Sequence, residues 1–309
     1  MDLGYDGRLF ILAADHRGSL KKKMFGISGR EATAEEQARL NEAKLVVWEG
    51  FRQAVAEGIP SSEAGVLVDE ETAAGVARAA TAAGVLLAMP VEKSGQDTFD
   101  FEFGEGFASH IEDFNPDFTK VLVRWNPEDD PAVKQEQGER LRRLGEWLHA
   151  RGRKYLFELL VLPTKRQLAL VGGNGADYDA HLRPALMLDV IYEIQEAGIE
   201  PDVWKIEGID GREDCELISR LIRRDGRDGV KAVVLGRGAD DAKVGHWLRI
   251  AAGVPGYAGF AIGRTIWWEA VHGWKEGKLT PAQAAAAIGA AYRRFIDVYE
   301  EAGRKGSPQ

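Results

Sequence analysis

Short apolar runs and longer amphipathic segments alternate along the whole chain, and this alternation limits most strongly how the chain can fold. Apolar runs bounded by turn residues are typical of buried strands, whereas apolar residues at helical spacing indicate helices that cover a core. The predicted strands are residues 9–13, 65–68, 85–89, 119–123, 155–161, 203–206, 232–235 and 259–262. The predicted helices are residues 34–57, 70–82, 105–113, 132–151, 181–197, 214–224, 241–252, 264–276 and 281–302.

A strand followed by a helix, repeated eight times, predicts a (β/α)8 TIM barrel. The main alternative is a doubly wound sheet, which would normally carry a glycine-rich dinucleotide fingerprint after its first strand. The segment Ala13-Ala-Asp-His-Arg-Gly18 lacks that spacing. No low-complexity linker divides the chain, although residues 171–177, rich in glycine, are predicted to form a mobile loop. We therefore expect one TIM-barrel domain over residues 1–309, with an extra C-terminal helix at about 281–302.

The charge balance argues against two classes of partner. A net charge of −9 and a pI near 5.3 do not fit a general nucleic-acid or membrane-surface binder, which would carry a basic face. No run approaches transmembrane length, and the polar residues 1–7 do not resemble a signal peptide. The single cysteine, Cys215, excludes an internal disulfide and fits a reducing compartment. We expect a soluble cytoplasmic protein. A homo-oligomer is also possible, because the apolar positions of residues 281–302 fit a subunit interface as well as packing on the barrel wall.

Polar residues at the ends of the predicted strands are the informative ones, because the active site of such a barrel forms at the carboxyl ends of its strands. In chain order these residues are Asp15, His16 and Arg17; Asp69 and Glu70; Glu92 and Lys93; Lys120 and Arg124; Glu158; Lys205 and Glu207; Gly236 and Arg237; Gly263 and Arg264.

Lys120, Glu158 and Lys205 lie within three successive apolar strands. A lysine in such a strand must snorkel, find a partner or lose its proton. Two inward lysines two strands apart would lower each other's pKa, and the neutral amine that results near pH 7 is a nucleophile for ketones. Glu158, between them, would balance the remaining cation and move protons. Ordinary ion pairs that close the barrel end are the alternative, but three such residues on successive strands favour a shared site.

The last two strand ends predict a phosphate site. Gly236-Arg-Gly238 and Gly263-Arg264 offer unobstructed backbone N–H groups together with guanidinium groups, where barrels of this kind commonly bind phosphate. The glycines could instead serve tight turns. Only His16 among the histidines stands at a strand end, and no two histidines have zinc-ligand spacing. A magnesium site from Asp15, Asp69 and Glu92 stays open.

Five motifs in the same order as in a known family span nearly the whole chain. They are Ile11-Leu-Ala-Ala-Asp-His-Arg17, Pro90-Val-Glu92, Thr119-Lys-Val-Leu-Val123, Pro201-Asp-Val-Trp-Lys-Ile-Glu207 and Gly259-Phe-Ala-Ile-Gly-Arg-Thr-Ile266. In these motifs the chain resembles the class I, Schiff-base aldolases of the tagatose-1,6-bisphosphate aldolase type. It is most similar to the aldolase domain fused to 5-dehydro-2-deoxygluconokinase in inositol catabolism.

The resemblance implies an aldolase that cleaves a phosphorylated ketose through a lysine imine and needs no metal or organic cofactor. Lys205 would form the Schiff base, with Lys120, Glu158 and Asp15 assisting proton transfer and holding substrate hydroxyls. Substrate and phosphate contacts would come from Arg264, Gly263, Arg237, Gly236, Arg17, Glu92 and Arg124.

Close likeness to the inositol-pathway enzyme would make the substrate 2-deoxy-5-keto-gluconate 6-phosphate, cleaved to dihydroxyacetone phosphate and malonate semialdehyde. Arg17 or Arg124 would then bind the carboxylate of that substrate. The residues alone leave two alternatives. One is a sugar-phosphate isomerase, epimerase or lyase that uses Glu158 and Asp15 as acid and base, with or without magnesium. The other is a non-catalytic barrel that binds a sugar phosphate.

Overall fold

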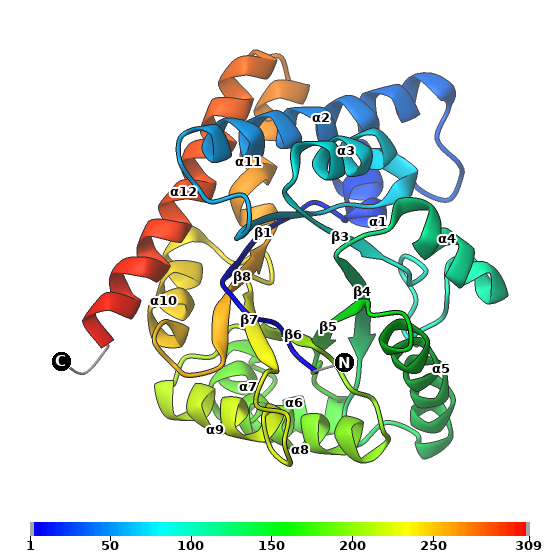
Figure 1. Cartoon of the computed structure of the whole chain (residues 1–309), viewed down its shortest axis with the longest axis vertical. Coiled ribbons are helices and arrows are strands. Elements are labelled where there is room, and N and C mark those ends of the chain that lie inside the picture. The colour runs from blue at the N-terminus through cyan, green and yellow to red at the C-terminus, as the bar shows by residue number, and fades with distance from the viewer. Residues whose placement is uncertain (1–2, 307–309) are drawn as a thin grey trace.

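A closed barrel of parallel strands forms the centre of the computed structural model, which describes residues 3–306 (Figure 1). The strands pair in chain order from the first to the eighth, and the eighth returns to the first. They are β1 (Leu9–Ala13), β2 (Ala64–Leu67), β3 (Leu86–Pro90), β4 (Phe118–Arg124), β5 (Lys154–Leu160), β6 (Val203–Glu207), β7 (Lys231–Leu235) and β8 (Tyr257–Ile262). The predicted (β/α)8 barrel is confirmed, with strand ends within two residues of those expected.

Helices surround this barrel on its outer side (Figure 1). They are α2 (Ala34–Ala56), α3 (Glu70–Ala83), α4 (Phe107–Phe114), α5 (Pro131–His149), α8 (Arg183–Glu196), α9 (Arg212–Ile222), α10 (Asp241–Ala251), α11 (Arg264–Lys275) and α12 (Pro281–Gly306). Shorter elements lie in the connections: α1 (Arg17–Ser19), a π-helix η1 (Leu20–Met24), a 3-10 helix η2 (Gly104–Gly106), α6 (Lys165–Leu170) and α7 (Gly175–His181). The extra C-terminal helix is present and extends four residues beyond its predicted end.

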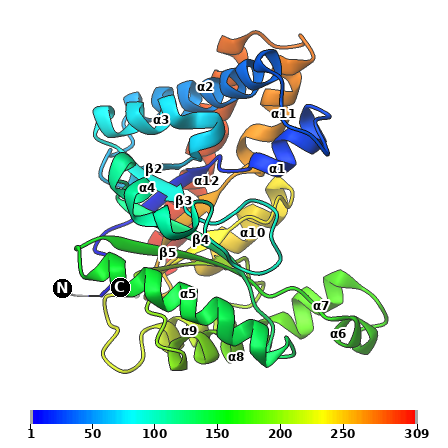
Figure 2. The same ribbon diagram turned by 90° about the vertical axis from the view of Figure 1, so that its right-hand side faces the viewer.

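The α6–α7 pair was not predicted. Residues 175–177, expected to be part of a loop, instead form the first turn of α7. Asn174 caps this helix, because its side-chain oxygen accepts a hydrogen bond from the amide of Ala176 at 2.9 Å. Figure 2 shows α1 and the α6–α7 pair at the same end of the barrel, away from both chain termini. Since α1 follows β1 and α6 follows β5, this is the end where the strands finish.

Strand side chains alternate between two apolar layers. In β1, Leu9, Ile11 and Ala13 point into the barrel, while Phe10 and Leu12 join the outer layer beneath the helices. Both faces of a parallel barrel strand are buried, so its residues are apolar on both sides. Tyr292 on α12 donates a hydrogen bond to the backbone oxygen of Phe10, which ties the C-terminal helix to the first strand.

The barrel interior changes from apolar to charged along three neighbouring strands. Phe118, Leu156 and Val203 fill the barrel beneath the site. Two residues further along each strand, the inward position is taken by Lys120, Glu158 and Lys205. The period of two thus places the charged layer directly above the apolar one.

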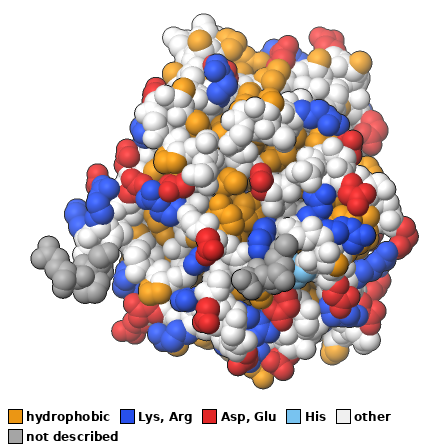
Figure 3. Space-filling model, viewed as in Figure 1, with side chains coloured by type: hydrophobic (Ala, Val, Ile, Leu, Met, Phe, Trp, Pro, Cys, Tyr) orange, Lys and Arg blue, Asp and Glu red, His pale blue; other side chains and the backbone are white. Residues whose placement is uncertain are grey.

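The outer surface shows no field of a single charge on the face drawn in Figure 3, where acidic and basic side chains are interspersed. Among the helices of residues 3–306, none is both long and apolar enough to span a bilayer. Cys215 is a buried free thiol, and burial raises its pKa to about 11.

Candidate active site

A cavity of about 420 Å³ opens where the strands end, and every residue that the resemblance assigned to the catalytic and substrate contacts lines it. These residues come from β4, β5 and β6 and from the segments that follow β1, β3, β7 and β8. The segment of residues 93–98 after β3 also contributes to the wall. Lys93 was among the expected strand-end residues, but the rest of this segment was not foreseen, because an irregular segment gives no periodic signal in the sequence.

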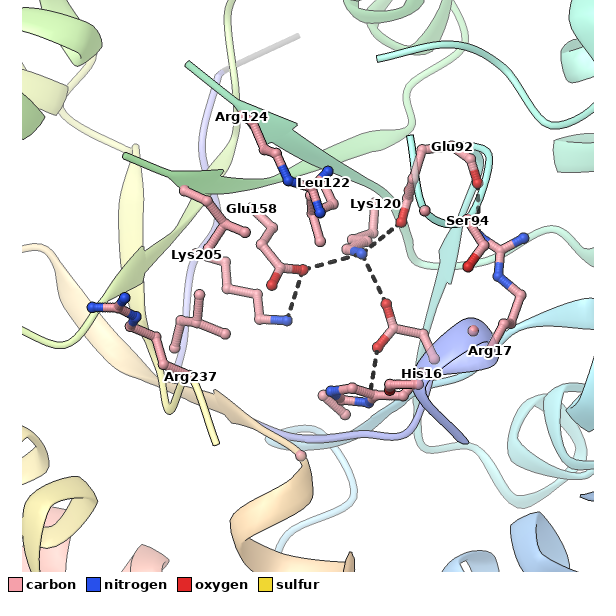
Figure 4. A pocket seen from close by; sticks show the side chains of 18 of the residues that line it. His16, Arg17, Glu92, Ser94, Lys120, Leu122, Arg124, Glu158, Lys205 and Arg237 are labelled. Carbon is pink, nitrogen blue, oxygen red and sulfur yellow. Dashed lines mark hydrogen bonds and ion pairs between the residues drawn. The ribbon is translucent and has the colours of Figure 1, made fainter. Parts of the chain in front are cut away.

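Lys120 lies at the centre of the cavity floor, in contact with three carboxylates (Figure 4). Its Nζ is 2.8 Å from Oδ2 of Asp15, 2.7 Å from Oε1 of Glu92 and 3.0 Å from Oε2 of Glu158. Burial alone would lower the pKa of Lys120, but the three carboxylates outweigh it and raise that pKa well above its ordinary value. The expected depression of the Lys120 pKa is therefore wrong, because opposite charges contact this amine directly.

Lys205 has fewer partners than Lys120. Its Nζ lies 2.9 Å from Oε2 of Glu158, which is the one carboxylate that contacts it within residues 3–306. Glu158 is the direct register partner of Lys205 across β5 and β6. Both lysines are buried, with side chains 1% and 2% exposed for Lys120 and Lys205. The two amines therefore share one carboxylate oxygen, as the predicted arrangement of Lys, Glu and Lys on successive strands requires.

The three acids around Lys120 differ in pKa. Burial raises the pKa of Asp15 and of Glu158, but the charges of Lys120 and Lys205 outweigh it and bring both pKa values below the ordinary range. Burial also raises the pKa of Glu92, and here the opposing charge of Lys120 does not cancel the increase. The cluster thus combines two carboxyl groups of lowered pKa with one of raised pKa.

Two of the predicted arginines bind the segment after β3 at the cavity wall. Arg17 donates to the backbone oxygen of Glu92 at 2.7 Å and pairs with Glu102 at 3.1 Å. Arg124 donates to the backbone oxygen of Gln96. These contacts hold both guanidinium groups against the segment after β3, on one side of the cavity.

Arg237 forms ion pairs with carboxylates other than the three that surround Lys120. Its Nε lies 2.9 Å from Oε1 of Glu207, and its Nη1 lies 2.7 Å from Oδ2 of Asp179 on α7. The guanidinium points away from Lys205 in Figure 4. Asp179 also accepts from Arg183 at 2.9 Å. Arg237 therefore links the α6–α7 pair to the end of β6, a role that sequence reasoning missed because neither Asp179 nor Arg183 lies at a strand end.

Gly263 and Arg264 stand at the start of α11, where the sequence predicted a phosphate site. The helix has no side-chain cap at this end. Arg264 donates from Nη2 to the backbone oxygen of Arg237 at 3.1 Å, while its buried Nε has no hydrogen-bond partner. A Cβ on Gly263 would lie 2.4 Å from the backbone oxygen of Ala13, so this glycine is required for close packing as well as for an open helix end.

The three carboxylates suggested for magnesium do not converge. Asp69 is buried outside the cavity, where it lies 3.0 Å from Nζ of Lys44 and caps α3 through the amide of Thr72. Asp15 and Glu92 instead contact Lys120. Across residues 3–306, no three His, Cys, Asp or Glu side chains are arranged as ligands of a metal ion.

Comparisons with known proteins found one matching family and two solved structures with a similar fold. A family model described as "Uncharacterized protein conserved in bacteria (DUF2090)" matches residues 5–303. The fructose-bisphosphate aldolase from Plasmodium falciparum, solved in complex with TRAP and a small-molecule inhibitor, matches with a TM-score of 0.67 and 14% identity, covering 98% of this chain and 93% of that chain. The protein Cgl0159 from Corynebacterium glutamicum matches with a TM-score of 0.58 and 18% identity, covering 97% of this chain and 88% of that chain. No curated protein sequence matches the chain. At these identities the solved structures establish the shared barrel fold.

Proposed function

The chain belongs to the DUF2090 family, and from the geometry of its cavity we propose that it is a class I aldolase that cleaves a phosphorylated ketose through an imine on Lys205. The observation that carries the proposal is the contrast between two buried amines that share Oε2 of Glu158. Lys120 is held by three carboxylates, whereas Lys205 is held by one. The similarity in fold to an aldolase supports the same reaction class.

The first half of the reaction forms the imine. Lys205 passes a proton to Glu158, and its neutral Nζ attacks the ketone carbon of the substrate. Glu158 then returns a proton to the hydroxyl of the carbinolamine, which leaves as water. Lys120 keeps its proton throughout, because its three carboxylates stabilise the cation. It therefore acts as a fixed positive charge beside the reacting carbons.

The second half breaks the carbon–carbon bond. A base removes the proton of the hydroxyl beyond that bond, an aldehyde is released, and the bonding electrons move into the iminium group to give an enamine. Protonation of the enamine carbon and hydrolysis of the imine then release dihydroxyacetone phosphate and restore Lys205. Residues of the chain suffice for every step, so the proposal requires no metal or organic cofactor.

Substrate binding follows from the charges on the cavity wall. The phosphate would lie against Gly263, Arg264 and the uncapped start of α11. The resemblance to the inositol-pathway enzyme makes 2-deoxy-5-keto-gluconate 6-phosphate the first substrate to test, with malonate semialdehyde as the aldehyde product. Arg124 and Arg17 would face its carboxylate, on the side of the cavity formed by the segment after β3.

Reduction of the trapped imine tests the proposal. The protein is incubated with dihydroxyacetone phosphate and sodium borohydride, and the modified peptide is identified by mass spectrometry. We expect irreversible inactivation, with the added mass on Lys205 and none in the Lys205→Ala variant. Lys278→Ala, which replaces an exposed lysine that does not line the cavity, is the control and should label like the wild type.

Absence of labelling, or labelling that persists in Lys205→Ala, would contradict the proposal. Release of triose phosphate from a panel of ketose phosphates then identifies the substrate. A protein that survives borohydride but loses its activity in EDTA would instead support the isomerase, epimerase or lyase alternative.

A further inference from the structure

Glu92 differs from the other acids of the cluster in having one oxygen without a partner. Its Oε1 lies 2.7 Å from Nζ of Lys120, whereas its buried Oε2 accepts no hydrogen bond. The backbone at Glu92 is held from two sides, by Arg17, which donates to its oxygen, and by an isolated bridge to Phe101. The residue is 8% exposed and lines the cavity. A buried unpaired oxygen on a rigid backbone needs an explanation, and binding or protonating a ligand is one.

The charges of the buried cluster point to the same residue. Two lysines, Lys120 and Lys205, face three acids, Asp15, Glu92 and Glu158. A net negative charge in a buried cluster is unfavourable, and a proton on one acid removes it.

Glu92 is the acid best placed to hold that proton. Glu158 contacts both lysines, and the charges of both lysines act on Asp15. Glu92 contacts Lys120 alone and is repelled by Asp15, while the guanidinium of Arg17 binds its backbone oxygen and the side chain of Glu102. Burial then keeps its pKa above the ordinary value.

We propose that Oε2 of Glu92 is the acid–base group for the hydroxyl at the bond that breaks, while Glu158 serves the nitrogen of Lys205. This assignment rests on the proposed aldolase function. In Figure 4 Lys120 lies between Lys205 and Glu92. A substrate chain that runs from the imine carbon past Lys120 therefore brings its next oxygen atoms to Glu92.

The proton transfers balance in both directions. In condensation, the enamine carbon bonds to the aldehyde carbon, and the nitrogen lone pair forms the iminium group. The electron pair of the aldehyde C=O moves onto its oxygen, which takes the proton of Glu92. In cleavage, Glu92 first releases its proton to solvent at the open cavity. Its carboxylate then takes that hydroxyl proton, and the carbon–carbon electron pair moves to the iminium group.

Separate measurements of enamine formation and of carbon–carbon bond cleavage test this assignment. Glu92→Gln keeps the oxygen that accepts from Lys120 and removes the ionisable group. Hydrogen exchange between dihydroxyacetone phosphate and D2O, followed by NMR, reports imine and enamine formation without bond cleavage. Cleavage is measured on the ketose phosphate that the wild type cleaves fastest. We expect cleavage to fall about 10²- to 10⁴-fold, the usual contribution of a general acid or base, while exchange and borohydride labelling persist.

Three comparisons make the result decisive. Glu158→Gln should lose both exchange and cleavage, and Glu92→Asp should recover part of the cleavage because it restores a carboxyl group. Glu128→Gln, which replaces an exposed glutamate outside the cavity, is the control and should retain both.

A Glu92→Gln variant that cleaves like the wild type, or that loses exchange together with cleavage, overturns the assignment. If the wild type forms no imine with dihydroxyacetone phosphate, the proposed function itself fails, and this assignment fails with it.

Discussion

Nζ of Lys205 and Oε2 of Glu158 lie 2.9 Å apart on residues that face each other directly across β5 and β6. The same oxygen is 3.0 Å from Nζ of Lys120. One carboxylate oxygen therefore lies between two buried amines of different surroundings. This arrangement couples the protonation of Lys205 to Glu158, because Lys120 is held by two further carboxylates and is not a ready proton source.

Replacement of Glu158 by Gln should stop proton transfer at Lys205 while it preserves the size of the side chain. We expect kcat for triose phosphate release to fall by about 10²- to 10⁴-fold. The rate of borohydride labelling should fall with it, since imine formation needs the same base. Glu128→Gln, on the surface outside the cavity, is the matched control. A loss of less than about tenfold would show that another group moves these protons.

Replacement of Arg264 by Lys should weaken phosphate binding. Lysine keeps the charge but cannot supply two parallel N–H donors, so we expect KM for a phosphorylated ketose to rise about tenfold, which corresponds to about 1.4 kcal/mol. The unphosphorylated ketose should show no such change. Arg166→Lys alters an exposed arginine outside the cavity and serves as the control. An equal effect on both ketoses would place the phosphate elsewhere.

Lys44 and Asp69 form a buried ion pair next to the site, with a distance of 3.0 Å between Nζ and Oδ2. Lys44 also donates to the backbone oxygen of Ala14, which precedes Asp15. Lys44→Met leaves the Asp69 carboxylate buried without its cation, so we expect the free energy of unfolding in urea to fall by about 3–5 kcal/mol. Arg52→Gln, which breaks an exposed pair with Glu49, should leave it unchanged. A loss under about 1 kcal/mol would mean that water solvates Asp69 in the variant.

His16 should make the fold sensitive to acid. Burial lowers the pKa of His16 to about 4, below its ordinary value of 6.5. As pH falls from 6.5 towards 4, the unfolded chain takes up a proton that the folded protein does not. Stability therefore decreases in this window and levels off below it, by up to about 3 kcal/mol from this residue.

The His16→Gln variant isolates this contribution. We expect the free energy of unfolding to change less between pH 7.5 and pH 4.5 in the variant than in the wild type, because glutamine does not titrate. Chemical denaturation at both pH values measures the difference. Equal changes in the two proteins would show that the His16 ring, 25% exposed, is solvated well enough to titrate normally.

The layout of the barrel could be predicted from the sequence because strand and helix periodicities are local. The period of two placed Lys120, Glu158 and Lys205 on inward positions, and the order of the strands made them neighbours. The strand ends likewise identified Asp15, Glu92, Gly263 and Arg264, all of which line the cavity. The α6–α7 pair was missed because its helices are short and flank a glycine-rich turn, so neither shows a clear period.

By itself, then, the sequence determined which residues of the strands face the cavity, since alternation along a strand depends on the backbone alone. Only the tertiary structure decided how those residues act on one another. The pKa of Lys120 rises because three carboxylates from different strand ends reach it, an effect that depends on distances of about 3 Å between atoms far apart in the chain. For the same reason Asp69 pairs with Lys44 outside the cavity, and Arg237 turns towards Asp179 and Glu207. Periodicity specifies to which side of a strand each side chain points. Charge interactions depend on the distances between charged atoms, which exist once the chain has folded.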